Sequence, residues 1–295
     1  MPAQLIAYPP EQAAIVLTVR PGDGVRIGRA RDNNLAIEHA SVSRQHASIE
    51  ASAPGWVLRD LDSKNGTFVE GQRAIGDVRI GQTCWLRFGD VHCRFALVSD
   101  SDLAADELGR SARRAAATAH TAQLEKITRL DDLLDASLRS VLDLSGFERG
   151  FLLLSHGEDF SVRASQALDP RALPDRAFSG SVGAVRRVLE QRHAFVANDV
   201  ARDAALAARD SVVARGLRGL LCLPLLEGDR TLGAIYADRT VDGPAITTLD
   251  LELLQAYAEH AAVWIAARRA TEQLIQGADL APRWSQIVAA QAEVA

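Results

Sequence analysis

The chain has 295 residues, of which 47% are hydrophobic and 24% charged, an ordinary globular composition that suggests about two domains. Its formal net charge is −5 and its pI is about 5.8. Proteins that bind nucleic acid in general are usually basic, so this balance argues against nucleic acid as a partner. Any phosphate-binding site must then be a local positive patch on an acidic protein.

The cysteines and the N-terminus indicate the cellular setting. Cys84, Cys93 and Cys222 are odd in number and lack the spacing of metal ligands. The first residues contain no basic segment followed by a long apolar one, so we expect no signal peptide. The longest apolar run, 220–226, is too short to cross a bilayer. We therefore expect a cytoplasmic protein in a reducing compartment, with no membrane segment and no metal site.

Residues 4–98 have the pattern of an all-β domain. Short runs of apolar and β-branched residues, such as 15–19, 56–59 and 84–88, are separated by Gly, Asp, Asn and Pro. Gly89-Asp90 between Phe88 and Val91 predicts a tight hairpin. This spacing is typical of a β-sandwich or barrel.

The remainder of the chain mixes helices and strands. Alanine-rich helical sequence follows the polar residues 99–102, and apolar residues at helical spacing predict an amphipathic helix over 120–144. Strands and shorter helices are expected to alternate over 149–239, with Ser181 capping a helix through Gln191. A second long helix is predicted over 248–269.

Three loop motifs in the β domain carry side chains suited to a phosphate and a peptide backbone. Arg29 follows Gly28 at a strand end, and an arginine stays charged and can bind a phosphate through two parallel hydrogen bonds. Ser43 offers a hydroxyl and, in a turn, a backbone N–H, beside the second charge of Arg44. Asn65 can donate and accept at once, as holding a main chain requires. Each motif alone is common in turns, so the prediction rests on their joint occurrence.

These motifs make residues 4–98 resemble the forkhead-associated (FHA) domain family. The matching segments are Gly28-Arg29, Ser43-Arg44-Gln45-His46 and Asn65-Gly66-Thr67, with Leu58-Arg59-Asp60 and Gly71 around them. The resemblance implies an eleven-stranded β-sandwich whose loops at one end bind phosphothreonine peptides.

Site roles follow from the same resemblance. It implies that Arg29 and Ser43 hold the phosphate, that Arg44 borders it and that Asn65 holds the peptide backbone. Lys64 lies where the family varies. Gly28, His46 and Gly66 are expected to shape the loops, although a histidine such as His46 is most often simply structural.

Residues 121–270 resemble the GAF family of small-molecule sensor domains. The resemblance is carried by 196–199 (VAND), 216–225 (GLRGLLCLPL) and 232–238 (LGAIYAD), followed by a long helix. It implies an α+β domain with a central antiparallel sheet and helices on its faces. The residues that could line a ligand pocket are Asp199, Arg218, Cys222 and Tyr236, for which structural roles are equally compatible with the sequence.

No ligand or cofactor is predicted for this second domain. Cys222 lies within a strand and is expected to be a buried small hydrophobe, because no neighbouring histidine completes a bilin attachment site. His156 and His193 are weak candidates for haem ligands. Asp131-Asp132 fits a solvated helix face better than a metal site.

The predicted organisation is an FHA domain over 1–98, a helical linker over 99–120, a GAF domain over 121–270 and a tail over 271–295. No nucleotide-binding, kinase, zinc-protease or paired-cysteine motif occurs, so we expect a bacterial-type signalling protein rather than an enzyme. The favoured function is a phosphothreonine-dependent adaptor whose partner is a Thr-phosphorylated protein, either a Ser/Thr kinase or its substrate.

Two alternatives remain open. In the first, the GAF domain is a small-molecule sensor, for example of a cyclic nucleotide, in a transcriptional or kinase pathway, and the FHA domain only localises it. In the second, the protein is a redox enzyme using Cys222, which burial of that thiol without a nearby base would exclude.

A homodimer is also expected. Ile127, Leu134 and Val141 keep a seven-residue spacing, which is the pattern of a helix that faces a partner helix along a straight seam. The same residues could instead cover the sheet of their own domain.

Overall fold

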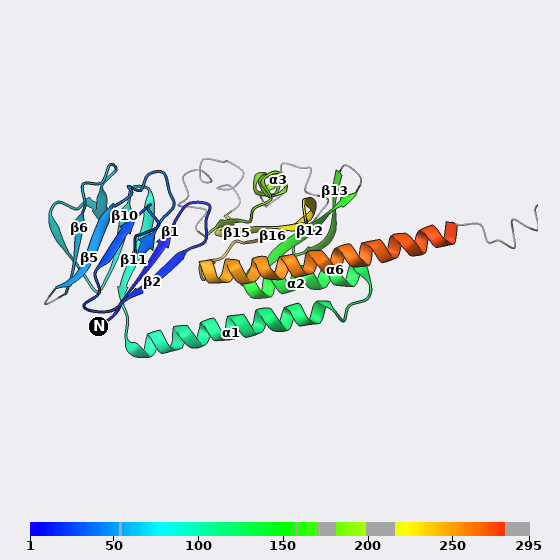
Figure 1. The fold of residues 1–295 in the computed structure, drawn as a ribbon, viewed down its shortest axis with the longest axis horizontal. Helices are drawn as coiled ribbons and strands as arrows, with labels where there is room; N and C mark the ends of the chain where they lie inside the picture. Colours follow the sequence, from blue (N-terminus) through cyan, green and yellow to red (C-terminus); the bar gives the residue numbers. More distant parts are fainter. Residues whose placement is uncertain (53–54, 157–158, 170, 172–180, 199–215, 281–295) are drawn as a thin grey trace, which may run out of the picture.

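The computed structural model describes residues 1–52, 55–156, 159–169, 171, 181–198 and 216–280. Within them a β-sandwich is followed by a mixed sheet-and-helix domain (Figure 1). No helix in these residues combines the length and apolar character needed to cross a bilayer.

The N-terminal domain is a sandwich of eleven strands in two sheets, as the FHA resemblance implied. The strands of the six-stranded sheet, in spatial order, are β2 (Ile15–Val19), β1 (Ala3–Tyr8), β11 (Val91–Leu97), β10 (Thr83–Phe88), β7 (Thr67–Val69) and β8 (Gln72–Arg73). Those of the five-stranded sheet are β4 (Leu35–Ala36), β3 (Val25–Gly28), β5 (Ala47–Ser52), β6 (Gly55–Asp60) and β9 (Asp77–Ile80).

Alternation of buried and exposed residues builds the core between these sheets. Along β1 the odd-numbered residues are buried, and along β10 the even-numbered ones are, because successive side chains point to opposite faces of a strand. The inward residues of both sheets form one cluster that includes Leu5, Ile27, Leu58 and Phe95. The hairpin predicted at Gly89-Asp90 is present, with Phe88 paired to Val91.

The second domain contains an antiparallel sheet covered on both faces, as expected for an α+β domain. Its strands, in spatial order, are β13 (Asp159–Gln166), β12 (Arg149–His156), β16 (Arg230–Arg239), β15 (Gly219–Glu227) and β14 (Phe195–Ala197). The helices α2 (Leu130–Ser145) and α6 (Thr248–Leu280) cover one face, and α3 (Val182–Gln191) covers the other (Figure 1). Each face has its own buried apolar cluster.

The single helix predicted over 120–144 is wrong, because the chain turns there. Helix α1 (Asp100–Leu124) ends at Glu125, and α2 begins after an extended Arg129. Arg268 of α6 donates hydrogen bonds to the carbonyl oxygens of Ile127 (3.0 Å) and Glu125 (3.5 Å). These bonds satisfy carbonyls that the break leaves without helical partners. The break lets α1 pack against α2 and α6, on the side of these helices away from the sheet (Figure 1).

The seven-residue spacing in this region serves the domain's own core. Leu134 and Val141 are fully buried, and Ile127 packs against the same cluster. A dimer seam through these three residues is therefore excluded. Helix α6 also extends beyond the predicted end at residue 269, to Leu280.

The two domains meet through the loop between β1 and β2. The backbone N–H of Ala14 donates to the carbonyl oxygen of Ile246, and the N–H of Thr248 donates to the carbonyl oxygen of Ala14, both at 2.9 Å. Glu11 in the same loop forms an ion pair with Arg187 of α3. The loop thus joins the sandwich to the segment that begins α6.

Candidate functional site

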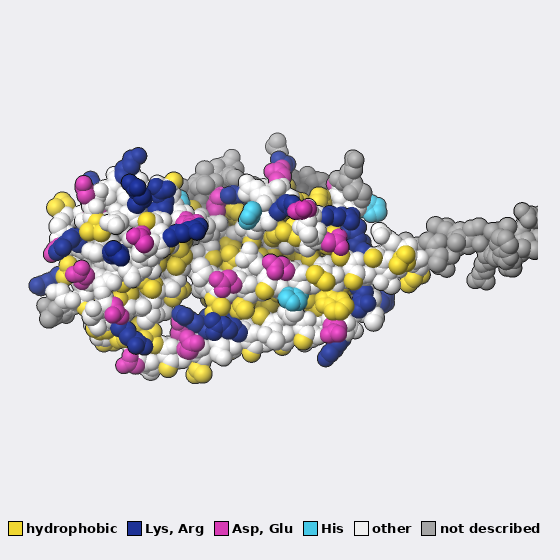
Figure 2. Space-filling model, viewed as in Figure 1, with side chains coloured by type: hydrophobic (Ala, Val, Ile, Leu, Met, Phe, Trp, Pro, Cys, Tyr) yellow, Lys and Arg dark blue, Asp and Glu magenta, His cyan; other side chains and the backbone are white. Residues whose placement is uncertain are grey.

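The loop motifs predicted from the sequence meet at one end of the sandwich. We call this site the phosphate hollow, about 750 Å³ in volume; its walls include Arg29, Ser43, Arg44, Lys64 and Asn65, together with Asp32 and Ser41. All five residues predicted to contact a phosphopeptide are therefore brought together. Figure 2 shows Lys and Arg side chains gathered at this end of the domain.

Arg29 lies directly after strand β3, where backbone hydrogen bonds join it to the loop that carries Ser43. The backbone N–H of Arg29 donates to the carbonyl oxygen of Ser43 (2.8 Å), and that of Ala30 donates to the carbonyl oxygen of Arg44 (3.1 Å). The backbones approach so closely at Gly28 that a Cβ there would overlap the Arg44 carbonyl oxygen. Only glycine fits this position, which explains the Gly28-Arg29 pair.

The Ser43 hydroxyl is oriented by the loop that carries Lys64. The backbone N–H of Lys64 donates to Ser43 Oγ at 3.0 Å. A hydroxyl that accepts this bond still has its own proton to donate, so Ser43 can offer that proton to an oxygen atom in the phosphate hollow. The expectation that the Ser43 backbone N–H also faces the ligand is wrong, because this N–H donates to His46 Nδ1 at 3.0 Å.

His46 joins two loops beneath the phosphate hollow. Its Nδ1 accepts from Ser43, so the neutral ring carries its proton on Nε2, which donates to the carbonyl oxygen of Gly66 at 3.2 Å. The imidazole is fully buried and packs edge-on against Phe88, with ring centroids 5.7 Å apart. Burial lowers the pKa of His46, against weaker opposing effects of Gly66 and Asp60. The predicted loop-shaping role of His46 is consistent with these contacts.

The loop carrying Asn65 is held by a network around Asp60. Burial alone would raise the pKa of Asp60, but hydrogen bonds from Ser63 and Thr67 hold it below its usual range. At the far end, Asn65 Nδ2 donates to the carbonyl oxygen of Ser41 at 2.7 Å. This bond leaves the Asn65 carbonyl oxygen and its second N–H to pair with a peptide main chain.

The charge of the phosphate hollow is positive. Arg29, Arg44 and Lys64 line it with one carboxylate, that of Asp32. Among the residues that the structure describes, neither Arg29 nor Arg44 has a carboxylate within ion-pair distance. Both guanidinium groups are therefore available to an anion.

The sequence did not indicate two residues, Asn33 and Ser41, whose hydrogen bonds hold the loops of the phosphate hollow together. Asn33 is buried, and its Nδ2 donates to the carbonyl oxygens of Ala30 (2.8 Å) and Arg44 (2.7 Å). Ser41 Oγ accepts from the backbone N–H of Asp90 at 2.8 Å. The run Asp32-Asn33-Asn34 near Arg29 is a turn signal that could have indicated Asn33, whereas nothing local indicates the contact between Ser41 and Asp90.

Of the four residues predicted to line a pocket in the second domain, the three that the structure describes do not share one cavity. Tyr236 and Cys222 are opposite each other in the sheet and fully buried. The Tyr236 ring stacks on Phe151 at 4.9 Å, and its hydroxyl donates to Asp238 at 2.6 Å. Arg218 is instead exposed and faces the first domain, and Asp199 lies outside the described residues.

The other candidates in this domain show no site chemistry. Burial raises the pKa of the Cys222 thiol well above its ordinary value, which disfavours the reactive thiolate. His193 is exposed and His156 lies at the edge strand pair, opposite Asp159. In the described ranges, no three His, Cys, Asp or Glu side chains are grouped so that they could hold a metal ion.

Comparison with known proteins finds two family matches along the chain. Residues 25–89 match the model of the FHA domain, and residues 128–266 match that of the GAF domain. The chain carries an FHA domain followed by a GAF domain. All five predicted contact residues of the phosphate hollow fall within the matched FHA segment.

Curated relatives match short segments of this chain. The FHA domain-containing protein At4g14490 of Arabidopsis thaliana is 43% identical over 54 residues, 18% of this chain and 14% of that protein. The transcriptional regulatory protein EmbR of Mycobacterium tuberculosis is 35% identical over 72 residues, 24% of this chain and 19% of that protein. The chain thus spans less than a fifth of the length of either relative.

Solved structures include neighbours of both domains. The GAF domain of a sensor histidine kinase from Pseudomonas syringae pv. tomato is 18% identical, with a TM-score of 0.43, and the match covers 59% of this chain and 98% of that one. EmbR, solved with a low-affinity phosphopeptide, is 29% identical with a TM-score of 0.27, covering 32% of this chain and 25% of that one.

Proposed function

We propose that this protein is a non-enzymatic signalling adaptor that binds a Thr-phosphorylated protein through its FHA domain. The observation that carries the proposal is the phosphate hollow, where Arg29 and Arg44 face the same space as the hydroxyl of Ser43. A phosphate dianion would receive charge-assisted hydrogen bonds from these groups, and such bonds are about twice as strong as neutral ones. Asn65 would then hold the peptide main chain beside the phosphate.

The matched FHA relative EmbR supports the same reading, since it has been solved with a phosphopeptide. We propose a Ser/Thr kinase, or one of its substrates, as the partner of this chain. A cytoplasmic setting suits such a partner, and the three free, buried cysteines fit a reducing compartment.

The GAF domain would convert partner binding into a further response. The loop between β1 and β2 bonds directly to the start of α6, so a shift in the sandwich would be transmitted to the helical layer. We also propose a homodimer, with α6 as the contact, because Val263 and Leu274 leave apolar side chains exposed on this helix.

The test is binding of the full-length protein to phosphothreonine peptides. A peptide library with a fixed phosphothreonine first selects a binding sequence, and isothermal titration then measures its affinity. Arg29→Ala should weaken binding about tenfold or more, since losing a hydrogen bond to a charged group costs about 1.5–3 kcal/mol. The unphosphorylated peptide should bind at least about tenfold more weakly than the phosphopeptide, by the same magnitude.

A matched control is available on the same strand. Arg26 is exposed on β3 and does not line the phosphate hollow, so Arg26→Ala removes the same charge without removing the contact. Wild-type affinity in Arg29→Ala, or an equal loss in Arg26→Ala, would contradict the assigned role of Arg29.

A further inference from the structure

Two arginines flank the ring of Phe68 on the outer face of the six-stranded sheet; we call Arg73, Phe68 and Arg87 the arginine row. Phe68 on β7 is the register partner of Arg73 on β8 and of Arg87 on β10. Because residues that oppose each other across a sheet point to the same face, the three side chains lie in one line across three strands. Leu86 and Phe88, the neighbours of Arg87, are buried, so this line faces outward.

Contacts within the arginine row fix the position of the Arg87 guanidinium. Its Cζ lies 3.7 Å from the centroid of the Phe68 ring, and its Nη1 donates to the carbonyl oxygen of Gly89 at 2.5 Å. A guanidinium has several N–H groups and this bond uses one of them, so the others can bind an anion. Because the side chain is already held over the ring, it has less conformational freedom to lose when a ligand binds.

Arg73 reaches the loop that carries Asn65. A Cβ placed on Gly66 would lie 3.2 Å from Arg73 Nε and 3.4 Å from Phe68 Cε2, so both side chains come up against the backbone beside Asn65. Arg73 is exposed, and among the residues that the structure describes its guanidinium forms no hydrogen bond or ion pair. It is thus a positive charge that can meet a ligand next to the phosphate hollow.

No carboxylate of the described part of the chain neutralises the arginine row. Glu70 and Asp90 lie in the neighbouring turns, and neither forms an ion pair with Arg73 or Arg87. Glu70 is turned toward β10, where its Oε1 accepts from the backbone N–H of Trp85 at 2.7 Å. An anion at the row would therefore be attracted by two guanidinium groups without displacing a carboxylate of the protein.

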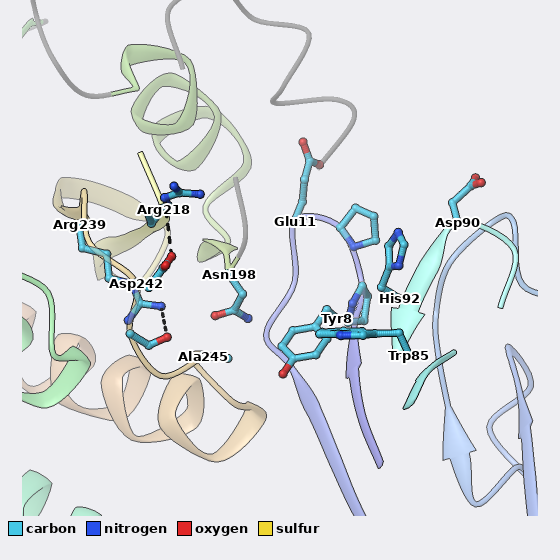
Figure 3. Close-up of a pocket in the computed structure, with 13 residues that line it drawn as sticks. Tyr8, Glu11, Trp85, Asp90, His92, Asn198, Arg218, Arg239, Asp242 and Ala245 are labelled. Carbon is cyan, nitrogen blue, oxygen red and sulfur yellow. Dashed lines mark hydrogen bonds and ion pairs between the residues drawn. The ribbon is translucent and has the colours of Figure 1, made fainter. Parts of the chain in front are cut away.

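The GAF domain limits how far a partner can extend along the same face. Beyond Arg87 the line continues to His92 on β11 and then to Tyr8 on β1. His92 and Tyr8 line a cavity of about 370 Å³ whose opposite wall belongs to the GAF domain (Figure 3). A partner bound to the FHA domain can therefore reach the arginine row but cannot continue across the whole sheet.

The phosphate hollow and the arginine row are adjacent. Asn65 lines the hollow, and Gly66, against which Arg73 lies, is the next residue, about 3.8 Å away between Cα atoms. The N–H of Gly89 donates to the carbonyl oxygen of Gly66 at 3.2 Å, which joins the turn bonded by Arg87 to the same loop. A peptide whose main chain passes Asn65 would reach the row in about two to four residues, at ~3.3–3.6 Å per residue.

We propose that the arginine row is a second subsite for the phosphorylated partner and that it binds an anionic side chain, a carboxylate or a second phosphate, about two to four residues from the phosphothreonine. This inference rests on the proposed function. The two guanidinium groups would bind the oxygens of the anion, and Phe68 would hold Arg87 in position. Because the row lies on one side of the phosphate hollow, it favours one orientation of the peptide.

The test uses full-length protein and the phosphothreonine peptide selected from the library. Each position up to four residues from the phosphothreonine, on both sides, is replaced in turn by Ala, Glu, phosphoserine or Arg, and affinity is measured by fluorescence polarisation at constant salt. At one or more positions, on one side only, Glu should bind about 2- to 5-fold more tightly than Ala, the range for an exposed ion pair. Phosphoserine there should gain at least as much, because it carries more charge and more acceptor oxygens, and Arg should bind no better than Ala.

Two variants show whether the gain arises at the arginine row. Arg73→Gln and Arg87→Gln should each reduce the advantage of the anionic peptide over the Ala peptide. Arg79→Gln is the matched control and should keep the gain, because Arg79 is also exposed but lies on β9 of the other sheet. Circular dichroism of each variant checks that it is folded, and Arg73→Gln provides the answer if Arg87→Gln is not, since Arg73 is an exposed residue.

The failures of the two proposals are distinguishable. If phosphorylation makes no difference to binding of the selected peptide, the proposed function is wrong and the second subsite falls with it. If phosphorylation is required but neither Glu nor phosphoserine improves binding at any position, or the gain is unchanged in Arg73→Gln, only the second subsite is wrong. A gain from phosphoserine alone that Arg73→Gln reduces would support the subsite and identify a second phosphate, rather than a carboxylate, as its ligand.

Discussion

Replacing His46 by alanine should destabilise the FHA domain as well as weaken phosphopeptide binding. The imidazole is fully buried and joins the Ser43 N–H to the Gly66 carbonyl oxygen. Each of these bonds contributes about 1 kcal/mol, and each group left unsatisfied and buried costs about 1–3 kcal/mol. The lost packing against Phe88 adds to this cost, so the free energy of unfolding should decrease by at least about 2 kcal/mol.

The change should be visible as a lower melting temperature. For a domain of this size about 1 kcal/mol corresponds to roughly 4–8 °C, so the transition of the FHA domain should fall by about 10 °C or more. Arg29→Ala is the comparison, since an exposed side chain away from the core usually changes stability by less than about 0.5 kcal/mol. Differential scanning calorimetry of both variants, with titration of the selected phosphopeptide, separates the two roles. A His46→Ala variant that melts like the wild type but no longer binds would refute the structural role and indicate direct contact with the peptide.

Three further predictions follow from the same geometry. Burial lowers the pKa of His46 below its ordinary value of 6.5, so the unfolded chain binds a proton more readily than the folded one. The contribution of His46 to the free energy of unfolding is therefore complete above pH 6.5 and decreases as the pH falls from 6.5 toward the lower folded pKa. Urea unfolding at pH 7.5 and 5.5 should therefore show a larger loss for the wild type than for His46→Ala, and equal losses would contradict the assignment. Gly28→Ala should force the Arg44 loop away and destabilise the FHA domain by about 1–3 kcal/mol, with loss of peptide binding, whereas unchanged urea midpoint and affinity would show that the loop moves freely. If α6 forms the dimer contact, sedimentation at micromolar concentration should show a dimer for the wild type and a monomer for Val263→Glu. Val241 is equally an exposed valine but lies outside the helix, so Val241→Glu is the control and should remain a dimer. A monomeric wild type would contradict the proposal.

The sequence predicted the five residues that the structure brings together in the phosphate hollow, because the side chains that can bind a phosphate are recognisable from local residue types. The positive charge of Arg29, the hydroxyl of Ser43 and the amide of Asn65 can each be read from their motifs. The contacts that hold these side chains in place could be predicted only in part. The Ser43 N–H was expected to face the ligand, but it is used by His46, and the bond between Asp90 and Ser41 joins segments 49 residues apart.

In the helical region, too, a contact between segments far apart in the sequence decided the structure. Apolar residues continue at helical spacing through the break between α1 and α2, so periodicity alone predicts one helix. The break is stabilised by Arg268, which lies 141 residues beyond Ile127 and leaves no local signal there. Because the chain folds back, Leu134 and Val141 are used by the core rather than by a partner. The contacts between the two domains could not be predicted either, since no motif states how two domains face each other.

The junction at Ala14 has a consequence for protein engineering. Both hydrogen bonds that join this loop to the start of α6 use main-chain atoms, so exchanging one side chain for another leaves them in place. Changing the number of residues between Tyr8 and Ile15 would instead displace the bonded backbone and alter the spacing of the two domains. A side-chain exchange in this loop could remove the ion pair of Glu11 with Arg187, but only a change in loop length would break the two main-chain bonds that join the modules.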